Sequence, residues 1–366
     1  MKNIARIALV SAALGSAASA APFLAIGDGA ELFVTGSLGV RADDNIYLTS
    51  NGISDTIFDI NPGVELTFGK DAALKGSLSL VDAFANYSDN SNLNTNLFSG
   101  NFNAAYDDAK LKLKFNLGYN ELNQNAPDIR GLTRRDQFAT GANAEVEISQ
   151  ITSIGTGVSF SHTNYKRKNY ADTDELTVPL NFYYKWTPKI DLSVGYRYRD
   201  YQTTIGQDST DHYFNVGARG EFTPLLTGQI SVGFNERKIS GGGSESLPGL
   251  EASLTYALTP KTNITFGGSN DYGTAPQGAQ QKNFSLNAGA STDINSEWKA
   301  NVGLSYRAID YYTRTDDYIE GTIGATYIVN TYAKINASYT YRNNSSALSG
   351  SEFTNNVFSI TASLRY

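Results

Sequence analysis

The chain has 366 residues and a formal net charge of −7 at pH 7, and it contains 34 Gly, 23 Tyr and no Cys. The acidic balance argues against nucleic acid as a partner, and the lack of cysteine excludes disulfide stabilisation. After Ala25 no stretch has the roughly 20 mostly apolar residues of a spanning helix, so any membrane crossing must use strands that close into a barrel.

The first twenty residues have the pattern of a signal peptide. Lys2 and Arg6 form a positive start, and residues 7–18 are apolar or small. Ala18, Ser19 and Ala20 make a cleavage site, which predicts Ala21 as the first mature residue. The alternative, a short membrane anchor, is disfavoured because the segment is short and a good cleavage site follows it.

From about residue 31 onward, segments of about 8 to 12 residues alternate between apolar and polar side chains, the pattern of strands with one face of each kind. Between 192 and 198, for example, Leu192 and Val194 interleave with Ser193 and Gly195. A soluble sandwich would alternate too, but this pattern runs longer than a typical sandwich domain. Aromatic residues such as Trp186 and Trp298 also gather at strand ends, as in outer-membrane girdles.

Connections of two kinds separate these segments. Short turns, such as 187–189 and 259–261, alternate with longer polar loops, such as 165–173 and 311–317. Short periplasmic turns and longer extracellular loops are typical of outer-membrane barrels. The sequence therefore predicts an all-β, antiparallel up-and-down transmembrane barrel of about 18 strands, or 16 if one weak hairpin is lost.

Three regions follow from this pattern: a signal peptide at 1–20, a short periplasmic segment at 21–30 and the barrel at 31–366. Similar segments recur about every 36 residues. A propeller also has repeats of about this length, but each of its blades contains four strands, which would have to be shorter than the segments seen here. We interpret the recurrences as hairpins of one barrel.

The polar face of the strands is predicted to line the lumen, and it carries more cations than anions. Many acids fall instead in the predicted loops, which suggests a basic pore inside an acidic chain. The alternative, that these charges only pair across strands, remains open at this stage. The predicted pore-lining residues are Lys112, Lys114, Arg197, Arg199, Arg219, Arg237, Arg307, Lys334, Arg342, Glu145, Glu147, Glu251 and Glu320.

The sequence contains few residues that could form a catalytic site. The two histidines are His162 and His212, and His212 follows Asp211, which could imitate an acid–base pair. We interpret both histidines as polar residues near the external rim. With two histidines and no cysteine a transition-metal site is not expected, and no cofactor is predicted. The chain is expected not to be an enzyme.

The last strand ends in alternating apolar residues and a terminal aromatic: Phe358, Ile360, Leu364 and Tyr366. This resembles the C-terminal recognition strand of bacterial outer-membrane proteins, in which Phe is the more common last residue. The resemblance implies a Gram-negative outer-membrane protein whose terminal strand is read by the barrel-assembly machinery.

In length, in its Thr-Pro-Lys turns and in the Tyr-Arg-Tyr-Arg strand at 196–199, the chain is similar to the putative beta-barrel porin 2 family. The resemblance implies a porin-like channel for hydrophilic solutes or the outer-membrane step of exopolysaccharide export. The competing hypothesis is a blocked barrel that serves as an anchor or a surface enzyme. Expected partners are outer-membrane lipid, lipopolysaccharide, the assembly machinery, and polysaccharide or anionic small solutes.

Overall fold

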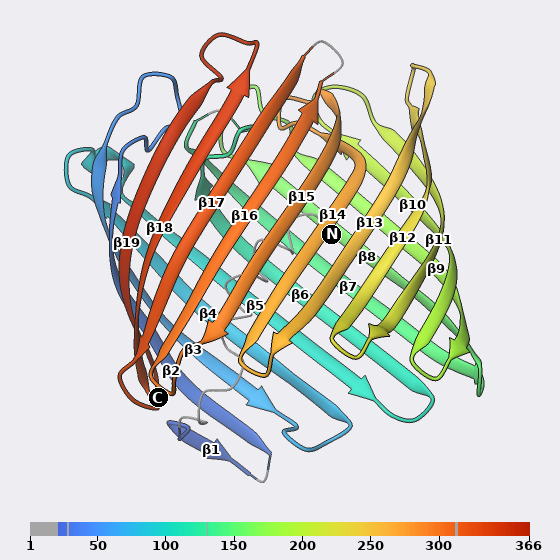
Figure 1. The fold of residues 1–366 in the computed structure, drawn as a ribbon. Helices are drawn as coiled ribbons and strands as arrows, with labels where there is room; N and C mark the ends of the chain where they lie inside the picture. The colour runs from blue at the N-terminus through green and yellow to red at the C-terminus, as the bar shows by residue number, and fades with distance from the viewer. Residues whose placement is uncertain (1–20, 28, 130, 312–313) are drawn as a thin grey trace.

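The computed structural model describes residues 21–366 apart from 28, 130 and 312–313. Eighteen long strands, β2 to β19, form a closed antiparallel barrel in which each strand pairs with its neighbours in sequence and β19 pairs with β2 (Figure 1). This confirms the all-β barrel of about 18 strands and not the 16-strand alternative. The elements are β1 Leu24–Ile26, β2 Ala30–Asp43, β3 Asp55–Phe68, β4 Leu74–Tyr87, η2 Ser91–Leu93, β5 Thr95–Asp107, β6 Leu111–Gln124, β7 Thr133–Ser149, β8 Thr152–Tyr165, β9 Thr173–Thr187, β10 Ile190–Thr203, β11 Ser209–Thr223, β12 Leu226–Ile239, β13 Ser244–Thr259, β14 Thr262–Thr274, β15 Gln280–Asp293, β16 Trp298–Asp310, β17 Thr315–Ile328, β18 Ala333–Ser346 and β19 Phe353–Arg365.

The connections differ in length at the two ends of the barrel. The turn between β9 and β10 has two residues, whereas the loop between β2 and β3 covers residues 44–54. In the β5–β6 turn, Asp108 accepts backbone N–H bonds from Lys110 and Leu111, both at 2.8 Å. These bonds hold the pKa of the Asp108 carboxyl below its usual range. The short turns and long loops thus match the predicted asymmetry.

Apolar side chains face outward from the barrel. Leu38, Val194 and Phe234 are each more than 60% exposed, which in water would be unfavourable but in a membrane places them against lipid. The ladder of backbone hydrogen bonds satisfies the polar backbone inside that belt. Among the described residues no helix is long and apolar enough to cross a membrane.

Three prolines lie within strands, where each removes one backbone donor. The β3–β4 pairing skips the neighbourhood of Pro62 and then resumes, and the β8–β9 pairing skips and resumes around Pro179. The pairing of β13 with β14 behaves differently, because it stops at the pair Leu250–Asn270 beside Pro248 and does not resume.

The barrel closes where the last strand meets the first long one. The backbone N–H of Val34 donates to Tyr366 at 2.6 Å, and Tyr366 donates back to Val34 at 2.9 Å. The short strand β1 pairs with the base of β2, and the ring of Phe23 packs edge-on against Tyr366. Ala21 is exposed here, while the predicted signal peptide, with Ala18 and Ala20, lies outside the described residues.

Candidate lumen site

The inner face of the barrel is identified by side chains that meet across strands which are not neighbours. Arg197 on β10 pairs with Glu251 on β13, and such a contact can form only on the concave side. Because side chains alternate along a strand, Arg199 shares that face while Val194 points to lipid. All thirteen predicted pore-lining residues occupy inward-facing register positions.

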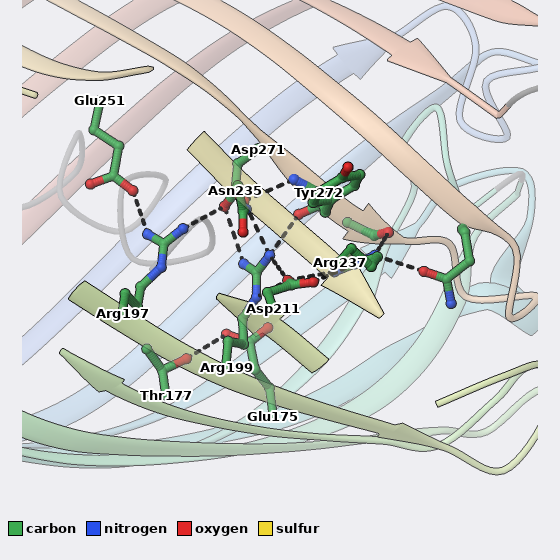
Figure 2. A network of polar contacts seen from close by, with 12 residues as sticks. Glu175, Thr177, Arg197, Arg199, Asp211, Asn235, Arg237, Glu251, Asp271 and Tyr272 are labelled. Atoms are coloured by element: carbon green, nitrogen blue, oxygen red, sulfur yellow. Dashed lines mark hydrogen bonds and ion pairs between the residues drawn. The ribbon is translucent and has the colours of Figure 1, made fainter. Parts of the chain in front are cut away.

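Asp211 on β11 is the centre of a buried charge network (Figure 2). Its carboxylate accepts from Arg237 Nε at 2.6 Å and Nη2 at 2.8 Å, and from Arg199 Nε at 2.7 Å. Arg237 and Asp211 are each 1% exposed. A carboxylate that receives two guanidinium groups from the neighbouring strands fixes β10, β11 and β12 together by charge-assisted hydrogen bonds.

Asp271 on β14 extends this network. It accepts from both terminal nitrogens of Arg199 at 3.1 Å, and Asn235 Nδ2 donates to it at 2.6 Å. Arg197 Nη2 lies 3.4 Å from Asp271, and its other terminal nitrogen binds Glu251. The three guanidinium groups are thus balanced by three carboxylates, as Figure 2 shows.

Aromatic rings support two of these arginines. The guanidinium carbon of Arg197 lies 4.8 Å from the ring centre of Tyr213, and that of Arg237 lies 4.7 Å from the ring centre of Tyr272. A Cβ built on Gly249 would come within 2.2 Å of the Tyr213 ring, so only glycine leaves room for that ring. The network is therefore packed as well as paired.

A second cluster lies nearer the periplasmic end. Arg219 on β11 makes a two-pronged contact with Glu145 on β7, at 2.6 and 2.8 Å, and contacts Asp191 at 3.1 Å. Its guanidinium carbon lies 3.5 Å from the ring centre of Tyr183. This contact joins strands four places apart and so bridges the concave wall.

Two further arginines of the predicted set have acidic partners. Arg342 on β18 donates from Nε to Glu320 on the adjacent β17 at 2.9 Å. Arg307 on β16 donates to Asp128 in the β6–β7 loop at 3.1 Å, and to Asn283 on β15. Since β16 and β6 belong to separate parts of the wall, the β6–β7 loop must fold into the lumen.

Apolar contacts at the extracellular end also place loops inside the barrel. Ile46 of the β2–β3 loop packs with Ile57 and Tyr87, and Leu48 packs with Tyr318 and Phe353. These strand residues occupy lumen-facing register positions. The two inward loops also touch, because Asn125 Nδ2 donates to the carbonyl of Ile46 at 3.3 Å. Together they narrow the extracellular mouth.

The lysines of the predicted set are arranged differently from the arginines. Lys112 stands opposite Glu145, Lys114 opposite Asn143 and Lys334 opposite Ser363, all on the lumen side. Among the residues that the structure describes, none of the three has a carboxylate within 4.0 Å. Glu147 lies opposite Ser153 on the same face and is exposed.

The sequence predicts an excess of cations in the lumen. Around the arginines this excess is absent, because three acids outside the predicted set also face the lumen. Asp191 pairs with Arg219, Asp211 with Arg199 and Arg237, and Asp271 with Arg199 and Arg197. Asp271 lies close to the extracellular end of β14, which continues to Thr274. Counting strand register outward from the short turns would have placed Asp211 opposite Arg199.

The histidines point away from this site. Asp211 faces the lumen, so its neighbour His212 faces outward and lies 2.8 Å from the Tyr196 hydroxyl. His162 is also on the outer face, 2.7 Å from Asp174. The adjacent Asp211 and His212 therefore cannot act as one acid–base pair. No group of acids and histidines among the described residues is arranged to hold a metal ion.

The four predicted assembly-signal residues, Phe358, Ile360, Leu364 and Tyr366, lie on the outer face of β19 or at its end and are between 41 and 50% exposed. The ring of Tyr366 also packs against Tyr332, with ring centres 5.3 Å apart. Their reading by the assembly machinery remains a prediction.

A family model described as "Putative beta-barrel porin 2" matches residues 32–366. No protein of curated function matches the sequence. Among solved structures, the outer membrane protein OpdK from Pseudomonas aeruginosa is 10% identical, with a TM-score of 0.50 over 93% of this chain and 100% of that one. OccAB2 from Acinetobacter baumannii is 11% identical, with a TM-score of 0.49 over 92% and 98%. At such identities the likeness concerns the fold alone.

Proposed function

The chain belongs to the putative beta-barrel porin 2 family, and we propose that it conducts small hydrophilic solutes through a water-filled lumen. It is a porin-like β-barrel of a Gram-negative outer membrane. The observation that carries the proposal is a closed ring of 18 strands with a polar inner face. Barrels of 16 to 18 strands are wide enough to leave an aqueous channel.

The inward loops limit the conductance of this channel. The β2–β3 and β6–β7 loops lie against lumen-facing residues at the extracellular end, so a solute must pass beside them. Where the β6–β7 loop enters the lumen, Asp128 of the loop and Arg307 on the wall of β16 lie beside the path. We expect a channel of limited conductance rather than a wide open pore.

Ion preference is proposed to come from the lysines. Arg197, Arg199 and Arg237 are neutralised by buried carboxylates and so contribute little net field. Lys112 and Lys114 stand on the lumen face without such close partners and supply positive charge along the permeation path. Cationic linings favour anions, so a mild anion preference is expected.

The test is recording from purified protein in planar bilayers. Stepwise current increases that scale with salt concentration are expected, and protein unfolded by heating should produce none. A folded, heat-modifiable protein that gives no current at any voltage would reject the channel and favour the anchor hypothesis. The comparisons give polysaccharide export no support, and it remains a prediction from the sequence alone.

A further inference from the structure

Asparagines on the lumen face of the barrel stand directly opposite glycines of the neighbouring strands. On β6 and β7, for example, Asn116 lies opposite Gly141, and Asn143 lies opposite Gly157. Because side chains alternate along a strand, both asparagines share the lumen face with Lys114. We call the asparagines of such pairs the amide girdle: Asn101 opposite Gly118, Asn116 opposite Gly141, Asn143 opposite Gly157, Asn181 and Asn215 opposite Gly195, Asn287 opposite Gly267, and Asn301 opposite Gly324.

Each glycine leaves room for the carboxamide of its partner. A Cβ built on Gly195 would lie 2.4 Å from Oδ1 of Asn181 and 2.7 Å from Oδ1 of Asn215. A Cβ built on Gly141 would lie 2.7 Å from Oδ1 of Asn116. The amides therefore lie across the neighbouring strand, in the space that any other side chain would fill.

Threonine hydroxyls occupy the same position at two further junctions. Oγ1 of Thr361 lies 2.9 Å from a Cβ built on Gly39, and Oγ1 of Thr265 lies 3.0 Å from one built on Gly289, in pairs that again stand directly opposite each other. A glycine that served only to curve the wall would need no such partner. On Gly303, which also faces the lumen, a built Cβ would meet no atom of another strand within 4 Å.

Most of the girdle amides make no hydrogen bond within the described chain. Asn101 Nδ2 donates to Asn120 Oδ1 at 3.2 Å, whereas the side chains of the other girdle asparagines have no partner among the residues that the structure describes. Asn143, Asn287 and Asn301 are exposed. Each of these amides therefore presents both a donor N–H and an acceptor oxygen to the lumen.

The girdle is neutral, unlike the charge network beside it. Arg197, Arg199 and Arg237 are buried and paired with carboxylates, and on β11 Asn215 lies nearer the periplasmic end than Asp211. A hydroxyl group both donates and accepts hydrogen bonds, as an amide does, whereas an anionic group only accepts and would also face the amide oxygens. The girdle thus suits a neutral molecule with many hydroxyl groups.

We propose that the amide girdle binds short neutral saccharides as they pass through the lumen. This rests on the proposed function and names a substrate class for it. Selectivity in a pore depends on its width and on the hydrogen-bond donors and acceptors that line it. The glycines serve both, because they let the amides lie close to the wall and leave the width of a side chain free for the solute.

The test measures how maltotriose, a neutral trisaccharide, reduces the ion current of single channels in planar bilayers. A saturable reduction is expected, with a much weaker effect from polyethylene glycol of the same hydrodynamic radius, whose ether oxygens only accept. Combining Asn181→Leu with Asn215→Leu should weaken maltotriose binding about 25-fold, because each lost hydrogen bond weakens binding roughly fivefold. Asn263→Leu is the matched control and should leave binding unchanged, because Asn263 faces the lumen opposite Ser291 and not opposite glycine.

A second pair of variants tests the position of the amides. Gly195→Ala adds a methyl group that displaces the amides of Asn181 and Asn215, so maltotriose binding should weaken at least about fivefold. Gly303→Ala adds the same methyl group where it meets no other strand and should have no effect. Heat-modifiable migration on gels checks that each variant is folded. Equal binding in these two variants, unchanged binding in the double leucine variant, or an equal effect of the two solutes would overturn the proposal.

Binding is also measured without a current, by saturation-transfer NMR of maltotriose on the folded protein in detergent. Transfer to the saccharide is expected in the parent protein and should be lost in the double leucine variant. Binding to a protein that conducts no ions would reject the proposed pore and support the girdle. Ion current without saturable binding of maltotriose would leave the pore in place and overturn the girdle.

Discussion

The carboxylate of Asp128 lies 3.1 Å from the guanidinium of Arg307, although 179 residues separate them in the chain. This ion pair ties the inward β6–β7 loop to the wall of β16. Both side chains are about one-fifth exposed, so the pair is partly shielded from solvent.

Arg307→Gln should release this loop. A partly exposed ion pair contributes about 1 kcal/mol, so the released state should become roughly fivefold more populated. Single-channel recordings should then show larger or more frequent open levels than in the wild type. Arg342→Gln is the control, because its Glu320 partner lies on the adjacent strand and holds no loop. Identical open levels in all three proteins would show that the β6–β7 loop does not limit the current.

Asp211→Ala should weaken the barrel strongly. It leaves the guanidinium groups of Arg199 and Arg237 without their shared carboxylate in a buried site, and removing one partner of a buried pair costs about 3–5 kcal/mol. Urea unfolding, followed by the shift between folded and unfolded bands on gels, should measure this loss. Asp174→Ala, at an exposed pair with His162, should change stability by less than about 1 kcal/mol. A variant as stable as the Asp174→Ala control would mean that the network does not hold the wall together.

Ion selectivity should follow the lysines. Replacing Lys112 and Lys114 with Ser should move the reversal potential in a salt gradient toward cation preference, most clearly at low salt where screening is weak. Replacing Arg197 and Arg199 with Ser leaves the carboxylates that they neutralise without these ion-pair partners. The change should therefore reduce the stability of the barrel more than it alters ion selectivity. A large shift with the arginine variant and none with the lysine variant would assign selectivity to the buried network instead.

Topology can be checked on intact cells, because the chain has no native cysteine. Cysteine at Asp172, in the loop after β8, should react with a membrane-impermeant thiol reagent, and cysteine at Lys189, in the turn before β10, should not. The Asp172 site accepts a backbone N–H from Tyr165 at 3.0 Å, so cysteine at the exposed Lys168 is a useful second probe of the same loop. Labelling at Lys189 alone would show that the barrel has the opposite orientation in the membrane.

Removal of Tyr366 should impair assembly. Its backbone makes both hydrogen bonds to Val34 that close the barrel at this edge, and its ring packs on Phe23 and Tyr332. The deleted protein should be depleted from the outer-membrane fraction, whereas Tyr366→Phe, which retains an aromatic ring and both backbone bonds, should insert normally. Normal insertion of the deleted protein would remove any role for this residue in assembly.

The strand pattern was predictable because alternation has a fixed period of two. Leu192 and Val194 against Arg197 and Arg199 give the outward and inward faces of β10 directly from the sequence. The charge partners were harder to find, because Arg199 meets Asp211 and Asp271 only once register and barrel curvature are known. The position of Asp128 beside Arg307 could not be inferred from any local pattern, since it depends on how one loop folds across the lumen.

Because Asp211 and Arg237 are buried, the ion pair between them should be insensitive to the salt concentration of the surrounding water. Dissolved ions screen exposed pairs such as Glu121–Arg134, in which the arginine is 45% exposed, over distances of about 10 Å at 0.1 M salt. They cannot enter a site that is 1% exposed on both partners. The buried ion pairs that join β10 to β14 should thus keep their contribution to stability as the salt concentration rises. The exposed ion pairs at the rim of the same barrel should lose theirs.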